Sequence, residues 1–523
     1  MLIRNIFSML IIFCVACSPS APAPTAVAVV TSAPTETATA TATATITPTA
    51  TLTQTPTITP TPTETPTQTA TFTPEPTPTI TPTPVNTPYP IPSIRFDNWA
   101  SVDVPTNYVA GNSYIAFINS NDIETITNLS TAEAQLTRAT LYFASPTNPA
   151  SRIPILEYET NQIDQFYLSP TGNAIAYFLN DLQRGASGLY ILDVVIGLSG
   201  RITTLPSPAQ RGIVSQPAWS PDGRFLAVTL ETGYGLGIFI FDTQQSTWAA
   251  LVNDGPFNFH PVWSPDGRHV AFISDRATCP TWVASVPNAC NPDTMPTPIS
   301  GQVYVLEFAT NNITQISPAV VSDAPYWVNN ETLAFASGDS FDLLNPTRSL
   351  WIADMRDKVG REVRLQNGAD RQLNLSDRWS PDGNLVIFQS AGTTNETIIM
   401  NRNGERIATL DDLTFVRFGM SASWSPDGTR LAIGGKGGQC TYGVRVLETT
   451  NFTIVASGSN PRAVCDPTYA PNGTRIAFLG IRTTSTSADG RADVYSSTRD
   501  GFETQSLTGD LRGQTRFIGW VGR

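Results

Sequence analysis

The chain has 523 residues, of which only 14% are charged, and it contains 42 prolines and 36 glycines. This composition is unlike that of a helical protein. The formal net charge is -12 and the only lysines are Lys358 and Lys436, so binding to a nucleic-acid backbone is not expected. His260 and His269 are the only histidines, which leaves little material for a histidine-based metal site or a Ser-His catalytic pair.

The N-terminus has the pattern of an export signal. Residues 6–13 form an apolar run after Arg4, and this run is too short to span a bilayer as a mature helix. It ends in Cys14, Val15, Ala16 and Cys17, which resembles a bacterial lipobox. The resemblance implies that Cys17 is diacylated and becomes the first residue of an extracytoplasmic, membrane-anchored protein at the cell surface or in the periplasm. The alternative is an ordinary signal peptide with an incidental cysteine.

Residues 18–92 have the composition of a disordered linker. Threonine and proline together make up more than half of this segment, and it contains no lysine, arginine or glycine. Such a sequence cannot bury enough apolar surface to fold. We therefore expect three parts: a lipoprotein signal peptide at 1–17, a disordered Thr/Pro-rich stalk at 18–92, and a folded domain at 93–523.

One pentapeptide recurs in the folded domain. The sequence Trp-Ser-Pro-Asp-Gly begins at Trp219, Trp263, Trp379 and Trp424, and degenerate copies begin at Leu168, Trp327 and Tyr469, with a last half-copy at Trp520. Apart from one longer interval, the copies follow one another at a spacing that suits a four-stranded propeller blade. Short apolar runs follow each copy, as in residues 226–228 and 269–273, and predict strands.

The residues of the pentapeptide are those of a tight turn. Proline presets φ at the first corner, aspartate tolerates the second corner and can bond back to the backbone, and glycine accepts a positive φ. The tryptophan is expected to bury a large surface between neighbouring blades. We therefore interpret the repeated aspartates as hairpin-stabilising residues, and we nominate none of them as catalytic or metal-binding.

Four perfect copies of this phrase, each followed by an apolar strand, resemble the TolB-like β-propeller repeat over residues 161–520. The resemblance implies an all-β fold, a single β-propeller of four-stranded blades. Residues 114–160 supply three strands without a preceding pentapeptide, and residues 517–520 supply one inner strand with nothing after it. Joining these gives an eighth blade and a ring closed by the C-terminal strand, with seven blades as the alternative.

The loops of this propeller are expected to be unequal on its two faces. The links between the third and fourth strands of each repeat are short (242–246, 402–406 and 499–502). Those between the second and third strands are long (119–138, 274–301, 337–347 and 480–492). Consecutive links alternate between the faces, so the elaboration is concentrated on one of them, where a rigid scaffold commonly carries its binding loops.

Four cysteines follow the signal region, an even number that suits an oxidising compartment. Cys279 and Cys290 lie in one long loop, and we expect them to pair. Cys440 and Cys465 lie in links that the topology brings to the same face of adjacent blades, and we expect them to pair as well.

The candidate binding residues lie on the elaborated face. Trp282 is carried by the loop that the first disulfide would close. Two roles are predicted for this bridge: it only stiffens the loop, or it orders the loop as a contact surface for a partner. His260 precedes the inner strand of its repeat, and the residues at the aligned positions form a mostly polar set that would surround the channel mouth. The ligand-binding candidates are therefore Trp282, His260, Asp466 and Gln216.

The sequence favours a non-catalytic binding or scaffold module for a protein or cell-wall glycan. No catalytic motif, metal-binding motif or cofactor motif is found. The alternative is an extracytoplasmic polysaccharide lyase or glycoside hydrolase, whose carboxylates or arginines would face the channel.

Overall fold

The structure is a computed structural model, and the chain divides into two units, Met1–Pro84 and Val85–Arg523. The residues that it describes are 100–103, 108–109, 112–120, 138–159, 162–181, 184–204, 209–338, 348–366, 373–391, 395–416, 419–436, 440, 442–458, 461–481, 492–511 and 513–522. The predicted signal peptide, Cys17 and the Thr/Pro-rich stalk lie outside these residues. Within the described ranges the regular structure is entirely β.

The first half of Val85–Arg523 forms antiparallel sheets of four strands, with small additions. In sheet order they are β35 (Gln514–Val521), β2 (Tyr114–Ser120), β3 (Arg138–Ser145) and β4 (Asn148–Glu159); β5 (Ile163–Leu168), β6 (Ala174–Leu179), β7 (Gly188–Asp193) and β8 (Leu198–Thr203); β11 (Ala218–Trp219), β12 (Phe225–Thr232), β13 (Gly235–Asp242) and β14 (Thr247–Val252); and β15 (Asn258–Trp263), β16 (His269–Ser274), β17 (Gln302–Glu307) and β18 (Asn312–Gln315). The additions are β1 (Ala100–Ser101), which pairs with β8, and the hairpin β9 (Ala209–Gln210) with β10 (Ile213–Val214).

The second half repeats the same arrangement. Its strands are β19 (Tyr326–Trp327), β20 (Thr332–Ser337), β21 (Ser349–Asp354) and β22 (Val359–Val363); β23 (Leu373–Trp379), β24 (Leu385–Ala391), β25 (Asn395–Asn401) and β26 (Arg406–Thr409); β27 (Met420–Trp424), β28 (Arg430–Gly435), β29 (Arg445–Glu448) and β30 (Ile454–Ser457); and β31 (Ala463–Tyr469), β32 (Arg475–Ile481), β33 (Ala492–Thr498) and β34 (Gln505–Ser506). The last two sheets are joined by one parallel bridge between Gly435 and Cys465. The fold is therefore all-β and propeller-like, as the repeat predicts.

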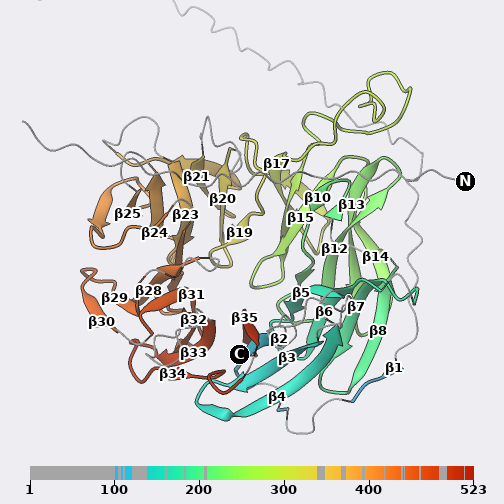
Figure 1. The fold of residues 1–523 in the computed structure, drawn as a ribbon. Helices are drawn as coiled ribbons and strands as arrows, with labels where there is room; N and C mark the ends of the chain where they lie inside the picture. Colours follow the sequence, from blue (N-terminus) through green and yellow to red (C-terminus); the bar gives the residue numbers. More distant parts are fainter. Residues whose placement is uncertain are drawn as a thin grey trace, which may run out of the picture. The chain divides into compact units, whose positions relative to one another are not determined.

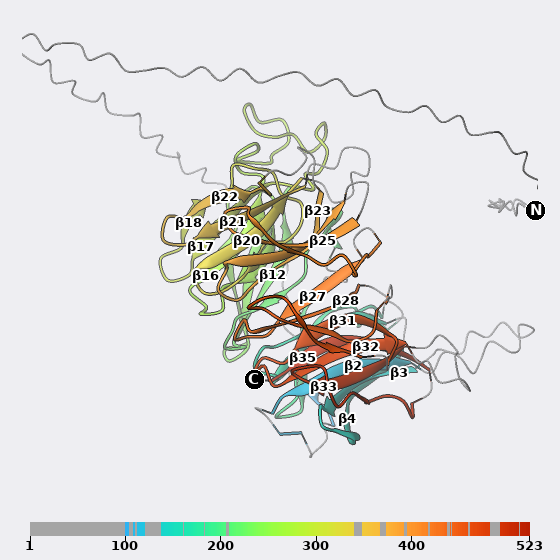
Figure 2. The same cartoon turned by 90° about the vertical axis from the view of Figure 1, so that its left-hand side faces the viewer.

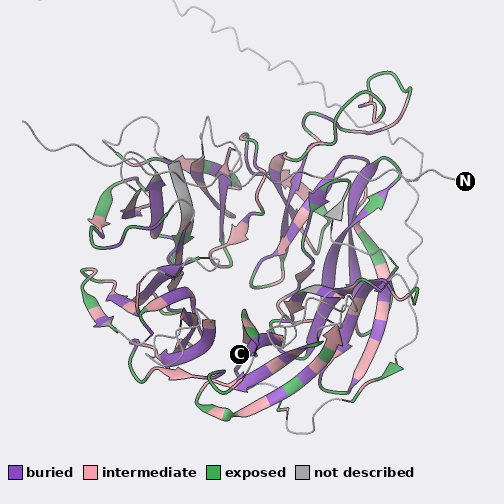
Figure 3. Cartoon of the chain, in the orientation of Figure 1, coloured by how far each residue is buried: buried purple, intermediate pink, exposed green. Residues whose placement is uncertain are grey.

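The middle strands of each sheet are apolar on both faces because each sheet packs between two neighbours. All eight residues of β13 are buried, whereas in β14, at the outer edge of the same sheet, only Val252 is buried and the other residues are exposed or half-buried. Figure 3 shows this difference as purple middle strands and green or pink outer strands. The burial of continuous apolar runs is what holds the sheets side by side.

Each pentapeptide forms the turn that the sequence predicts. Ser264 Oγ donates to Asp266 Oδ1 at 2.7 Å, and the same oxygen accepts the Arg268 N–H at 3.1 Å. The His269 N–H donates to Ser264 Oγ at 2.9 Å, and Gly267 has a φ of 72°. The turns at Ser220, Ser380 and Ser425 contain the same bonds. The aspartate is thus occupied by its own turn.

The motif tryptophans connect consecutive sheets. Each of four indole N–H groups donates to a backbone carbonyl that comes directly before the motif position of the preceding sheet. These bonds are Trp219 to Tyr167 (2.9 Å), Trp327 to Val262 (3.2 Å), Trp424 to Arg378 (3.1 Å) and Trp520 to Thr468 (2.9 Å). The predicted position of these side chains between repeats is confirmed, and it includes a directional bond as well as buried area.

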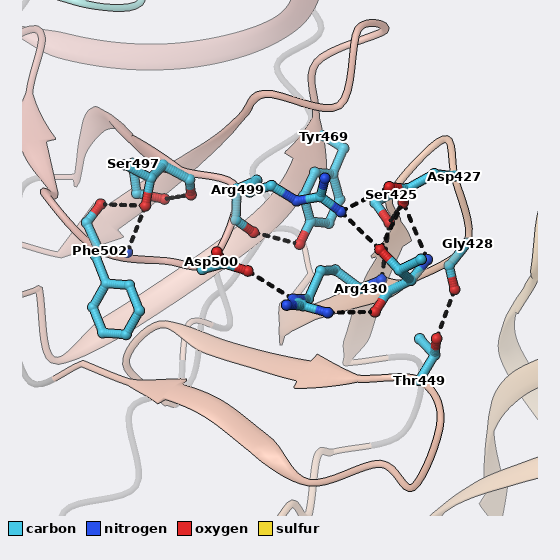
Figure 4. A network of polar contacts seen from close by, with 12 residues as sticks. Ser425, Asp427, Gly428, Arg430, Thr449, Tyr469, Ser497, Arg499, Asp500 and Phe502 are labelled. Carbon is cyan, nitrogen blue, oxygen red and sulfur yellow. Dashed lines mark hydrogen bonds and ion pairs between the residues drawn. The ribbon is translucent and has the colours of Figure 1, made fainter.

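A polar network reinforces one such junction, between the β27–β30 and β31–β34 sheets (Figure 4). Arg499 donates to Asp427 Oδ2 at 2.9 Å, and its carbonyl accepts the Tyr469 hydroxyl at 2.8 Å. Beside it, Arg430 Nε donates to Asp500 Oδ1 at 2.6 Å. The motif turn of one sheet is therefore tied to the β33–β34 hairpin of the next.

The C-terminal strand pairs with the N-terminal part of the domain. β35 is antiparallel to β2, with Tyr114 opposite Val521 and Ser120 opposite Gln514, and Figures 1 and 2 both show the two strands adjacent. Its Trp520 bonds to the β31–β34 sheet as described above. On the other side, Val521 shares an apolar cluster with Phe166 of the β5–β8 sheet.

The connections between strands lie at the two ends of the strands, and we name these two sides the turn face and the loop face. The turn face carries the motif turns, and there Thr171 and Asp222 line one cavity of about 550 Å³. The loop face carries the links between second and third strands and those between sheets, as shown by the Trp282 N–H, which donates to the Gly255 carbonyl at 3.4 Å. Of the four long loops expected on this face, 274–301 is described in full.

Candidate functional site

Two of the predicted channel-mouth residues lie at irregularities in inner strands. The register of β15 with β16 shifts between Phe259 and Val262, and that of β31 with β32 shifts between Cys465 and Thr468. His260 and Asp466 lie within these shifts and have φ values of 56° and 51°. A bulge re-aims a side chain, and a positive φ in a residue other than glycine stores strain that persists where the surroundings impose it.

The remaining aligned positions are varied in exposure. Gln216, Gln165 and Ala324 are exposed, and Ser421 is half-buried. Gln216 follows Ser215, whose hydroxyl oxygen accepts the backbone N–H of His260 at 2.8 Å. His260 lies in the β15–β18 sheet and Asp466 in the β31–β34 sheet, four sheets later in chain order. The predicted ligand-binding role of these residues stays a prediction.

A polar cluster that the sequence did not indicate lies close to His260. Arg348 forms an ion pair with Asp323, and its Nη2 lies 4.0 Å from Asp377 Oδ1. The Tyr326 hydroxyl donates to Asp377 Oδ2 at 2.9 Å, and the guanidinium of Arg378 lies 5.5 Å from the centre of the Tyr326 ring. We name His260, Asp323, Tyr326, Arg348 and Asp377 the inner polar cluster.

The inner polar cluster is assembled from three consecutive sheets. His260 is in β15, Tyr326 is in β19 and Asp377 is in β23, while Asp323 and Arg348 lie just before β19 and β21. A sequence signal for it would have been Tyr326 itself, because small or aliphatic residues, Ala218 and Val262, precede the tryptophan in two other copies. The pairing of Arg348 with Asp323, from a different part of the chain, has no sequence signal.

Burial sets the charge states of the cluster. Desolvation lowers the pKa of His260 below its ordinary value, and the nearby Asp323 opposes this only in part. Burial and the adjacent Asp377 carboxylate raise the pKa of Tyr326 well above its ordinary value. Both side chains are therefore neutral near pH 7, and the cluster presents paired charges and hydrogen-bond donors.

The loop between β16 and β17 is stapled, and its tryptophan is buried. Cys279 and Cys290 are disulfide-bonded, as expected, with Cα atoms 5.6 Å apart. The side chain of Trp282 is 2% exposed and its ring packs at 5.2 Å on Phe257. Its indole N–H donates to Asp275 Oδ2 at 2.8 Å. This corrects the expectation that the loop presents Trp282 to a partner, because the indole anchors the loop to the sheet below.

Asp275 is the polar end of this anchor. Its Oδ1 accepts the Phe257 N–H at 2.8 Å, and its carbonyl accepts the N–H groups of Thr278 and Cys279. Burial raises the pKa of Asp275, and the Trp282 hydrogen bond offsets that rise only in part. The residue therefore fixes the first part of the loop, up to Trp282, to the link between the sheets.

The second disulfide joins neighbouring sheets. Cys440 follows β28, Cys465 lies in β31, and their Cα atoms are 4.7 Å apart. Cys465 precedes Asp466, so the bridge holds the bulge on which Asp466 lies. The expected pair is confirmed, although Cys465 lies within the inner strand β31 and not in the link before it.

Within the described part of the chain, no group of three or more His, Cys, Asp or Glu side chains is placed to hold a metal ion. The same residues contain no helix long and apolar enough to cross a membrane. The carboxylates of Asp323 and Asp377 both interact with Arg348, which gives them a structural role that needs no catalysis.

The fold and site therefore define a propeller-like protein with a stapled loop face. Residues 155–286 match the family model of the TolB beta propeller domain. Curated relatives named Tol-Pal system protein TolB, from Francisella tularensis subsp. mediasiatica and subsp. tularensis, are 29% identical over 279 residues. These matches cover 52% of this chain and 56% of the relatives, so the chain spans about half of their length. The chain therefore carries TolB-like propeller repeats.

Solved structures are similar at lower identity. An oligogalacturonate lyase from Vibrio parahaemolyticus is 12% identical with a TM-score of 0.39, covering 71% of this chain and 95% of that one. TolB from Acinetobacter baumannii is 15% identical with a TM-score of 0.32, covering 74% of this chain and 79% of that one.

Proposed function

We propose that this protein is a non-catalytic binding or scaffold module, displayed outside the cytoplasm, whose loop face holds a protein or cell-envelope ligand. The observation that carries the proposal is the stapled loop, in which a disulfide, a buried indole and the buried Asp275 carboxylate fix the long link between β16 and β17. A loop ordered before binding loses less conformational entropy when it meets a ligand. The Tol-Pal system named for the relatives supports a protein partner.

The binding test uses the full chain and a loop variant. The protein is immobilised and exposed separately to envelope proteins and to cell-wall polysaccharides, and retained material is measured by interferometry. A variant with residues 283–289 replaced by a glycine-serine segment of equal length is the comparison. We expect saturable binding that the variant weakens. Equal, non-saturable retention by both proteins would remove the proposal, and release of shortened glycan would replace it with the enzyme alternative.

We also propose that Cys17 carries a lipid anchor and that residues 18–92 are the tether. The support is the apolar run before Cys17 and the Thr/Pro composition after it. Cys17→Ala should move the protein from the membrane fraction to the soluble extracytoplasmic fraction while the folded domain is unchanged. Membrane retention of that variant would contradict lipidation at this position.

The strand pairing supports an eight-bladed ring closed by the C-terminal strand. β35 supplies the inner strand to β2, β3 and β4, and Trp520 bonds to the preceding sheet in the same way as Trp219 and Trp424. Ending the chain before Gln514 should therefore abolish cooperative unfolding. Retained cooperativity in the truncated protein would favour the seven-bladed alternative.

A further inference from the structure

One segment of the stapled loop is largely exposed and has no backbone hydrogen bonds within itself. Residues 295–300 read Met-Pro-Thr-Pro-Ile-Ser, and we name them the proline arm. Met295 and Ile299 are 41% and 62% exposed, unlike the buried Trp282. No strand or turn is formed by residues 296–298, and Figure 1 shows the loop, in yellow-green, extending beyond β17.

The sequence fixes the conformation of the arm. Proline holds its own φ within the polyproline range, and the residue before a proline is driven into extended geometry. Pro296 and Pro298 therefore restrict the whole stretch 295–298 to the region of a polyproline II helix. Among the backbone hydrogen bonds of the described residues, none involves the N–H or C=O groups of residues 296–300. The carbonyls of the arm are thus available to an external donor.

Both ends of the arm are clamped. At its start, the Met295 N–H donates to the Asn291 carbonyl at 2.9 Å, and the Asp293 N–H donates to Asn291 Oδ1 at 2.9 Å. At its end, Gly301 and Val321 exchange backbone hydrogen bonds at 3.0 and 2.7 Å. A side chain at Gly301 would meet the Ser274 carbonyl, so glycine is required for this close approach. The arm is therefore held at both ends without being buried.

The charge of the surrounding loop narrows the choice of partner. Between residues 277 and 300 the only charged side chain is Asp293, and five residues are prolines. Recognition through charge pairs is therefore not available to this segment. What it offers is a rigid stretch with two exposed apolar side chains, proline rings and free carbonyls. These features are what aromatic-lined grooves use when they bind polyproline II segments.

We propose that the proline arm is the part of the loop face that a protein partner recognises, and that the partner binds it in an aromatic-lined groove. This inference rests on the proposed binding function and specifies its partner. Trp282 and the Cys279–Cys290 bridge act as supports that hold the arm in place. The partner's tryptophan or tyrosine N–H and O–H groups bond the free carbonyls, and Met295 and Ile299 pack at the edges of the groove.

The test uses the full chain in the cells that express it. A photo-crosslinking benzoylphenylalanine replaces Thr297 at the centre of the arm, and a second protein carries it at Val286 on the same loop, outside the arm. A polyproline decapeptide is the competitor. We expect a protein adduct at position 297 that the decapeptide reduces, and whose purified partner binds Pro296→Ala/Pro298→Ala about tenfold more weakly. Pro265→Ala, an exposed proline in a motif turn on the turn face, should leave the affinity unchanged.

Other outcomes overturn the inference. They are no adduct at position 297, an adduct that neither the decapeptide nor the double substitution affects, and an adduct with a second copy of this chain. An unchanged melting temperature and an intact disulfide mass confirm that the double variant is folded. If the full chain still binds its ligand while the proline substitutions have no effect, the proposed function stands and only the arm is excluded. Failure of the unmodified chain to bind anything removes both.

Discussion

The turn face and the loop face of the same sheets are stabilised by different interactions. On the turn face, four turns repeat the same serine and aspartate bonds, and each aspartate is occupied by its own hairpin. On the loop face, the segment from Ser274 to Gly301 has no counterpart elsewhere among the described residues and is fixed by a disulfide and a buried indole. Repetition therefore marks the residues that hold sheets together, and its interruption marks the residues that can be specific.

The two tryptophan environments give the largest expected contrast. Trp424 seals the junction between two sheets, so Trp424→Ala should reduce the free energy of unfolding of the whole domain by about 3–5 kcal/mol. Trp282→Ala removes a similarly buried side chain from a loop, so the lost stability should be local. It should appear as faster proteolysis between Cys279 and Gly301. Urea denaturation measures the first effect and limited proteolysis the second. Equal changes in global stability would show that the loop is part of the common core.

The sequence was sufficient to predict the repeated part of the fold. The pentapeptide determined the hairpins, the strand order and the burial of tryptophans, because each of these depends on residues within one repeat. Both disulfides followed from loop lengths and faces. The burial of Trp282 did not follow, since it depends on Phe257, which approaches from the neighbouring link, and on Asp275 at the start of the same loop. The inner polar cluster was missed for the same reason, because three sheets contribute to it.

The disulfides differ in the same way as the tryptophans. By chain entropy, the 11-residue and 25-residue closures stabilise by about 3 and about 3.5 kcal/mol. Cys440→Ser/Cys465→Ser opens a connection between two sheets, so it should lower the global melting temperature. Cys279→Ser/Cys290→Ser should release mainly the loop. Calorimetry of the two variants measures this difference, and a larger drop for the loop variant would reverse our ranking.

A smaller effect is expected from the ion pair between sheets. Asp427 and Arg499 are both partly exposed, so their coupling in a double-mutant cycle should be about 0.5–1 kcal/mol. Asp382 forms the same turn bonds, but its Oδ2 accepts a hydrogen bond from the side-chain amide of Asn384 within that turn. Asp382→Ala combined with Arg499→Ala should therefore be additive. Denaturant titrations of the four proteins in each cycle decide this, and coupling at Asp382 would contradict the local origin of the effect.

The smallest expected effect is a dependence on pH of opposite sign on the two faces. In the turn at Asp427, the hydrogen bond from Ser425 lowers the pKa of the carboxyl, against a smaller effect of burial. At Asp266, burial would raise the pKa, but the bonds from Ser264 and the Arg268 N–H together lower it. A carboxyl with a lowered pKa stabilises the folded state above its ordinary pKa, and that stabilisation is lost as pH falls through the folded value.

Asp275 has the opposite sign because burial raises its pKa. Its contribution to the free energy of unfolding is greatest below the ordinary pKa of 3.8. This contribution is lost as the pH rises through the higher pKa of the folded state. When the pH is lowered from about 6 to about 3, hydrogen-exchange protection should therefore fall at the motif turns. Over the same range, protection of the backbone around Asp275 should stay constant or rise. Asp275→Asn keeps an acceptor for Trp282 and should remove the pH dependence of the loop alone. If protection falls equally on both faces in the natural protein, acid acts on the sheets as one unit and the two faces do not differ in their stability.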